Sequence, residues 1–75
     1  MIIEEKELQK IGERLKKLRV KNNYGSYEDF AVKNDLSRMQ YWRIEKGKTN
    51  ITLRSLIVIL NIHQISIEDF FADNF

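Results

Sequence analysis

The sequence offers few side-chain arrangements that could carry out catalysis. Acidic residues occur as sequence neighbours, and neighbours on a helix point about 100° apart, so they cannot work as a catalytic dyad. These pairs are Glu4-Glu5, Glu28-Asp29 and Glu68-Asp69. His63 is the only histidine and cysteine is absent, so no second imidazole or thiolate could complete a metal site. The three glycines are isolated and form no phosphate-binding loop. We therefore expect no enzyme, no cofactor and no metal.

A different chemistry is indicated by LSRMQYWRIEKGK, residues 36–48, where aromatic rings stand among basic residues. On a helix over 38–46, Tyr41 and Ile44 fall within about 60° of each other, so they form one face. The opposite side carries Arg38, Met39, Trp42 and Arg43. The wheel thus predicts that the tyrosine is core and that the tryptophan is exposed.

An exposed face with two arginines, a tryptophan and a methionine is typical of an interaction site. Arginine can donate a bidentate pair to guanine, the apolar side chains can meet a thymine methyl or a sugar edge, and the capped helix N-terminus can approach a phosphate. The alternative is that Trp42 packs against the first helix or a neighbouring molecule while the arginines are merely solvated. Taken alone, the stretch favours neither interpretation.

Composition sets wide bounds. Seventy-five residues predict one domain over 1–75, with 13 Lys and Arg against 11 Asp and Glu and a pI near 9.0. This mild basicity permits nucleic-acid binding without requiring it. The start, MIIEEKELQK, has acids where a signal peptide needs basic residues, and no apolar run approaches the roughly 18 residues of a membrane helix. We expect a soluble, cytoplasmic protein.

Apolar spacing and capping residues predict the elements. Leucines and isoleucine at 8, 11, 15 and 18 predict an amphipathic helix over about 3–22, which ends in the turn-rich run 22–25. Ser26 with Asp29 starts a second helix, which carries Phe30 and Ala31 inward and breaks near 34–35.

Ser37 with Gln40 forms a capping box for a third helix over 38–46, which Gly47 ends. Residues 52–63 could be a buried strand, but their length and Thr52 as N-cap favour a helix with Leu53, Leu56 and Leu60 inward. Ser66 with Asp69 precedes a short final helix. Five helices without a strand predict an all-α fold.

From Ile11 to Phe71 the sequence resembles the helix-turn-helix domain of the phage repressor and Cro family, including xenobiotic-response-element-type bacterial regulators. The matching stretches are IGERLKKLR, SYEDFAVKNDLSRMQYWRIEKG, N-x-T-L-x-S-L and ISIEDFF. The resemblance implies a compact five-helix lambda-repressor-like domain, with a supporting helix over 27–34 and a recognition helix over 38–45. Its base-reading positions fall on Arg38, Met39, Trp42 and Arg43. Its phosphate-contacting positions fall on Tyr27, Lys46, Lys48, Thr49 and Asn50, to which the cap predicted above adds Ser37 and Gln40.

Four places depart from the family's pattern. Tyr27 replaces a glutamine, Asn34-Asp35 replace an apolar residue and the turn glycine, Tyr41 replaces a small aliphatic residue, and His63-Gln64 replace leucine and glycine. The resemblance also implies a semi-buried ion pair that joins Arg19 on the first helix to Glu45 on the third. The alternative is two independent surface charges, worth under about 1 kcal/mol.

The leading hypothesis is a sequence-specific transcriptional regulator, a repressor, that binds double-stranded DNA. The alternatives are a protein-interaction module that uses Met39 and Trp42, and a helix-turn-helix antitoxin or adaptor; an enzyme is a distant third. Because one small module buries too little surface for tight specific binding, we expect a homodimer on an inverted repeat. The candidate interface consists of Val58, Ile62, Phe71 and Phe75.

Overall fold

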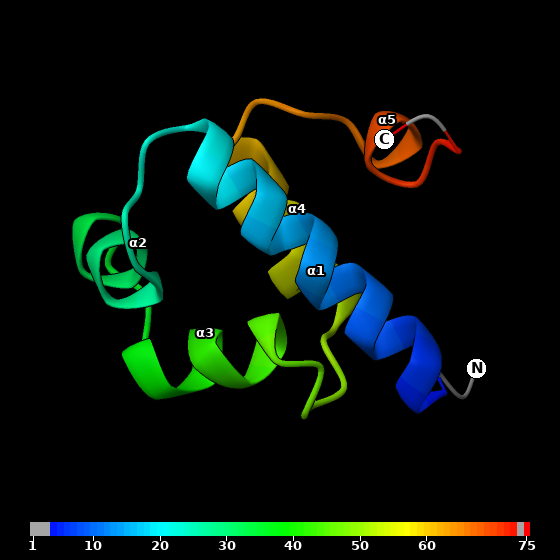
Figure 1. The fold of residues 1–75 in the computed structure, drawn as a ribbon, viewed down its shortest axis with the longest axis horizontal. Coiled ribbons are helices and arrows are strands. Elements are labelled where there is room, and N and C mark those ends of the chain that lie inside the picture. Colours follow the sequence, from blue (N-terminus) through cyan, green and yellow to red (C-terminus); the bar gives the residue numbers. More distant parts are fainter. Residues whose placement is uncertain (1–3, 74) are drawn as a thin grey trace.

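The computed structural model describes residues 4–73 and 75, and within them the chain forms helices and no strand. The helices are α1 (Glu5–Lys21), α2 (Tyr27–Lys33), α3 (Arg38–Glu45), α4 (Leu53–Ile62) and α5 (Ile67–Phe70) (Figure 1). The predicted all-α fold is confirmed, and residues 52–63 form a helix. The predicted start of the first helix at residue 3 lies outside the described residues.

Four helices begin at a hydroxyl side chain that accepts a hydrogen bond from the backbone N–H three residues further on. The oxygen-to-nitrogen distances are 3.0 Å at Ser26, 3.3 Å at Ser37, 3.1 Å at Thr52 and 3.1 Å at Ser66. Each bond satisfies one of the N–H groups that a first helical turn leaves free. The helix starts predicted from these residues are therefore correct.

The turns after the helices use residues in the left-handed conformation. Asn23, Asp35, Gly47 and Gln64 have φ of 69°, 57°, 70° and 57°. Asp35 and Gln64 stand where the resemblance expects other turn residues, and both still adopt positive φ. The turn between α2 and α3 and the end of α4 thus keep a left-handed residue without glycine.

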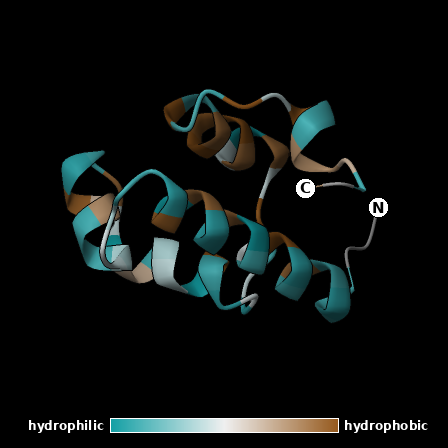
Figure 2. Ribbon diagram, turned by 45° about the horizontal axis from the view of Figure 1, so that its top comes forward, coloured by the Kyte–Doolittle hydropathy of each residue, from teal (hydrophilic) through white to brown (hydrophobic). Residues whose placement is uncertain are grey.

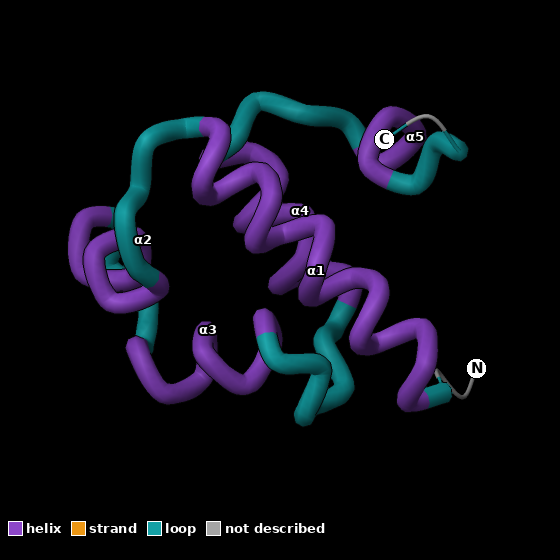
Figure 3. Tube along the Cα trace, viewed as in Figure 1, coloured by secondary structure: helices purple, strands orange, loops and turns teal. Residues whose placement is uncertain are grey.

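The long helix α1 crosses the molecule, with α4 behind it, α2 and α3 on one side of it and α5 on the opposite side (Figures 1 and 3). The largest fully buried side chains come from all five helices: Leu15, Phe30, Tyr41, Leu60 and Phe70. Hydropathy is highest along α4, whereas α1 alternates (Figure 2). The core therefore lies between α1 and α4 and is completed by side chains of α2, α3 and α5.

The predicted inward face of α4 was wrong in one residue. Leu53 is 62% exposed, and Ile59 joins Leu56 and Leu60 in the core instead. On a helix wheel of α4, the mean direction of Leu56, Ile59 and Leu60 lies about 70° from Leu53, which is in the first turn. Within the described part of the chain, no helix has the length and apolar character needed to cross a membrane.

Candidate functional site

Helix α3 has one buried and one exposed side. Tyr41 is 1% exposed and Ile44 also lies in the core. On the other side Met39 is 60% exposed, and Arg38 and Arg43 are exposed as well. The separation of Tyr41 from these residues agrees with the wheel. Trp42 differs from its three predicted partners because it is half-buried.

Two glycines let the backbone of α3 approach α1 closely. A Cβ atom at Gly12 would collide with the carbonyl oxygen of Glu45 and would lie 2.8 Å from that of Ile44. Gly47 is buried against the backbone of Gln9, where a Cβ would lie 2.8 Å from Cα, and its φ is +70°. Both ends of this contact need a residue without a side chain, so the carboxyl end of α3 has a fixed position on α1.

Arg19 and Glu45 form a two-pronged ion pair between α1 and α3. Arg19 Nε donates to Glu45 Oε2 at 2.9 Å and Nη2 donates to Oε1 at 3.0 Å. Arg19 Nη1 also donates to the carbonyl oxygen of Tyr24 at 3.0 Å, and the two charged side chains are only 7% and 6% exposed. The bond to Glu45 raises the pKa of Arg19 above its usual value. One arginine thus connects α1, α3 and the α1–α2 turn.

Phe30 lies at the centre of an aromatic cluster under α2 and α3. Its ring centroid is 4.8 Å from Tyr41, 4.8 Å from Tyr24 and 4.9 Å from His63, whose ring stacks on it at 9°. The Tyr41 hydroxyl is buried and has no hydrogen-bond partner among the described residues. Burial raises the pKa of Tyr41, so this large side chain behaves as a neutral core residue.

The contacts of His63 join the ends of two helices. Its Nδ1 lies 2.8 Å from Asn22 Nδ2, which can only donate, so this nitrogen accepts and the imidazole is neutral. Burial lowers the pKa of His63. Asn22 belongs to the end of α1 and His63 to the end of α4, so the contact joins two helix termini.

The predicted contact residues form two groups, one at each end of α3. At its amino end, a hollow of about 350 Å³ is lined by Tyr27, Glu28, Ser37, Arg38 and Met39. At its carboxyl end, Lys46, Lys48, Thr49 and Asn50 line a second hollow beside the start of α1. Arg43 and Trp42 lie between the two groups along the helix. Tyr27 on α2 and Arg38 on α3 therefore line the same hollow.

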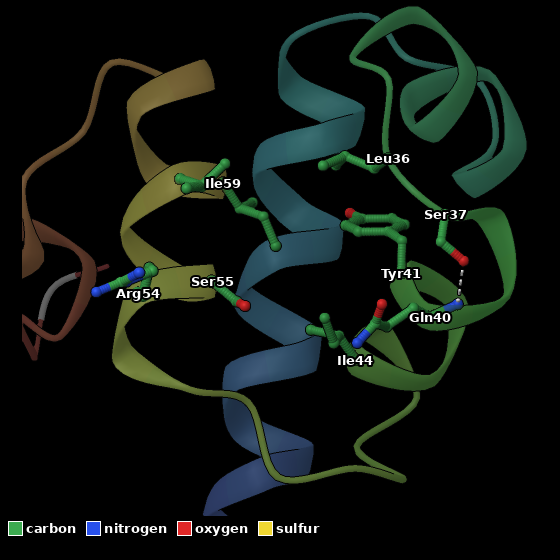
Figure 4. Close-up of a pocket in the computed structure, with 9 residues that line it drawn as sticks. Leu36, Ser37, Gln40, Tyr41, Ile44, Arg54, Ser55 and Ile59 are labelled. Atoms are coloured by element: carbon green, nitrogen blue, oxygen red, sulfur yellow. Dashed lines mark hydrogen bonds between the residues drawn. The ribbon is translucent and has the colours of Figure 1, made fainter.

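Gln40 lines a third hollow, an apolar groove of about 250 Å³ between α3 and α4 (Figure 4). The α3 wall carries Ser37, Gln40, Tyr41 and Ile44, and the α4 wall carries Arg54, Ser55, Val58 and Ile59. Figure 4 shows the Ser37 hydroxyl directed at the Gln40 N–H, which caps α3. Two of the predicted phosphate contacts, Ser37 and Gln40, thus line a groove that is bordered by α4.

The candidate interface residues do not form one uniform surface. Val58 and Phe71 are 46% and 48% exposed, whereas Ile62 and Phe75 are half-buried and pack against the core. Ile62, predicted as an interface residue that points away from the inner side of α4, instead packs against the core. The Phe75 ring lies under the Arg14 guanidinium at 5.0 Å, and Arg14 Nη1 donates to the carbonyl oxygen of Phe70 at 2.6 Å. Phe75 is consequently engaged within its own chain.

Several features of the site were not predicted from the sequence. Leu53 and Ile57 extend the exposed apolar surface beside Val58, and Glu28 places a carboxylate beside Arg38. Lys48 lies over the Trp42 ring, a contact that depends on the path of the loop. Glu28 and Ile57 could have been found from helix wheels of α2 and α4, but the lysine could not.

Two short helices joined by a tight turn, with the carboxyl end of the second held against α1 and its arginines exposed on the outer side, define a small helix-turn-helix domain. The chain is 39% identical over 64 residues to control protein C.MunI from a Mycoplasma species, a match that covers 85% of this chain and 86% of that protein. The chain therefore belongs to this control-protein family of helix-turn-helix regulators. No family model matches the chain, and no solved structure matches it.

Proposed function

We propose that this protein is a sequence-specific DNA-binding transcriptional regulator, formed by one domain over 1–75, that inserts α3 into the major groove. The observation that supports this most is that α3 is buried on one side and exposed on the other. Tyr41, Ile44 and Glu45 attach it to the domain, and Arg38, Met39 and Arg43 face outward. Arginines on a rigid, exposed helix can read guanine edges, and the name of the relative describes a control protein.

The phosphate contacts flank this helix. Tyr27 and the Ser37-capped start of α3 lie at one end, and Lys46, Lys48, Thr49 and Asn50 lie at the other. Their separation along α3 suits the two strands that border a groove, because phosphate contacts position a recognition helix and base contacts supply specificity. Glu28 sits inside the first group and would disfavour a phosphate placed close to it.

Selection of bound DNA from a random pool, followed by a salt titration, tests the proposal. We expect a recovered half-site and a linear fall of the logarithm of affinity with the logarithm of salt concentration, because bound phosphates release counterions. Recovery of no sequence, together with affinity independent of salt, would contradict DNA recognition and favour the protein-interaction or antitoxin function.

The proposal includes a homodimer on an inverted repeat. The side chains of Leu53, Ile57 and Val58 on α4, and of Phe71 directly after α5, remain exposed and are the candidate contact between two chains. Two recognition helices would then lie roughly 34 Å apart on DNA. Val58→Glu should give a folded monomer with weak operator affinity, whereas Val32→Glu, on the exposed surface of α2, should leave the dimer intact. A strict monomer in sedimentation, free and on DNA, would exclude the dimer.

We further propose that the protein represses transcription from the promoter that it occupies. A bound dimer over a promoter would block polymerase access. A reporter gene placed behind the selected half-site should lose expression when the protein is produced. An increase in expression would assign the protein as an activator.

A further inference from the structure

Lys48 lies over the indole ring of Trp42, with its Nζ 5.6 Å from the ring centroid. This distance is within the range of about 6 Å in which an ammonium is attracted by an aromatic face. Trp42 belongs to the predicted base-reading side of α3, and Lys48 to the phosphate-contacting loop. The two predicted kinds of DNA contact are therefore physically joined at this pair.

The backbone of the loop directs Lys48 back toward α3. The N–H groups of Lys46, Gly47 and Lys48 donate to the carbonyl oxygens of Trp42, Ile44 and Arg43 at 3.0, 3.1 and 2.8 Å. Gly47 adopts the left-handed conformation and is buried against Gln9. Because these bonds fix the chain on both sides of Gly47, the start of the Lys48 side chain has one direction.

Trp42 is less exposed than the other residues on the outer side of α3. Arg38, Met39 and Arg43 are exposed, whereas Trp42 is half-buried. A ring whose face carries an ammonium has less of that face available for a base. A lysine already held on a ring loses less conformational freedom when it binds DNA than a free lysine side chain does.

We infer that Trp42 is a positioning residue for Lys48: its indole holds the Lys48 ammonium at the edge of α3, where it contacts a DNA phosphate. Trp42 then strengthens binding to every sequence alike and leaves base preference to Arg38 and Arg43. This inference rests on the proposed function and refines the role of one residue within it.

The pair can be measured in the free protein, without DNA. Ring currents of the indole should shift the side-chain methylene protons of Lys48 upfield in the NMR spectrum, and Trp42→Leu should abolish the shift. Lys46, two residues away in the same loop, is the internal control and should show neither effect. Lys48 protons that match those of Lys46 and do not respond to Trp42→Leu would overturn the inference.

The role in binding is tested by a double-mutant cycle of Trp42→Leu and Lys48→Gln, measured on the selected operator and on shuffled DNA. The coupling should change the Kd by about two- to fivefold, equally on both DNAs. Trp42→Leu should also lower the salt slope as Lys48→Gln does, and Trp42→Phe should restore part of it. The control cycle with Lys46→Gln should show no coupling.

Two results would contradict the inference in different ways. A change of base preference in Trp42→Leu, with no coupling to Lys48, would make Trp42 a base reader. Absence of salt-dependent DNA binding by the unmodified protein would refute the proposed function, and the positioning role with it. The NMR result distinguishes the two cases, because it reports the contact between the side chains independently of DNA.

Discussion

Helices α3 and α4 are adjacent in the chain and are attached to the domain by different means. The eight-residue α3 has only Tyr41 and Ile44 in the core, and it relies on a buried ion pair and two close glycine contacts for the rest. The ten-residue α4 has an apolar sequence, buries Leu56, Ile59 and Leu60, and leaves further apolar side chains exposed. Directional contacts thus position a polar helix that buries little apolar area, whereas an apolar helix is positioned by burial.

The largest expected effect is the difference in stability between substitutions of the two adjacent aromatic residues of α3. Tyr41→Ala should cost about 3–5 kcal/mol and unfold a domain of this size, because it removes a fully buried aromatic ring. Trp42→Ala should cost much less stability, because the indole is only half-buried, and should weaken DNA binding. Denaturant unfolding and a binding titration measure both. Equal destabilisation by the two substitutions would place Trp42 in the core and remove the distinction between them.

Removing one partner of the Arg19–Glu45 ion pair should reduce the free energy of unfolding more than replacing both partners does. Glu45→Ala leaves the Arg19 guanidinium buried without its carboxylate, so it should cost about 3 kcal/mol. The double variant Arg19→Met with Glu45→Leu should recover much of this loss, because neither charge then remains buried. Urea unfolding of the three proteins checks the order. A double variant less stable than Glu45→Ala would show that the pair itself is strongly stabilising.

Substitutions on the outer side of α3 and directly after it should distinguish residues that read bases from residues that bind phosphates. Arg43→Ala or Arg38→Ala should weaken operator binding by about 1–3 kcal/mol and relax base preference, whereas Lys46→Ala should weaken all sequences alike and lower the salt slope. Kd values on the operator and on single-base variants provide the test. If Lys46→Ala altered preference and Arg43→Ala did not, the roles would be reversed.

The smallest effect concerns the end of α4. The pKa of His63 is lowered in the folded protein, so the unfolded chain binds more protons as the pH falls past the ordinary value of about 6.5. Stability contributed by neutral His63 is present above that pH and is lost as the pH decreases toward its folded pKa. The Tm should therefore fall between pH 7.5 and 5.5. His63→Gln should flatten this dependence, and an unchanged slope would assign it to other groups.

The helix starts were predictable because each depends on residues a few positions apart. Ser26, Ser37, Thr52 and Ser66 all form their caps through the third residue on. The inner face of α4 was misread at Leu53 because periodicity does not show where a packing partner ends.

Contacts between distant segments could not be predicted in this way. The approach of Gly12 to Glu45 and the position of Lys48 on Trp42 depend on how the elements pack and on the path of a loop. The pairing of Arg19 with Glu45 was available from the family resemblance rather than from any local pattern.

The close approach at Gly12 makes the domain a single cooperative unit. A helix as short as α3 is unstable alone in water, so it exists only while α1 supports it. Any molecule that occupies the outer side of α3 therefore stabilises α1 and the core as well, by an amount set by its concentration relative to its Kd. Proteases attack unfolded chains, so occupancy of the target would prolong the lifetime of the whole protein in the cell.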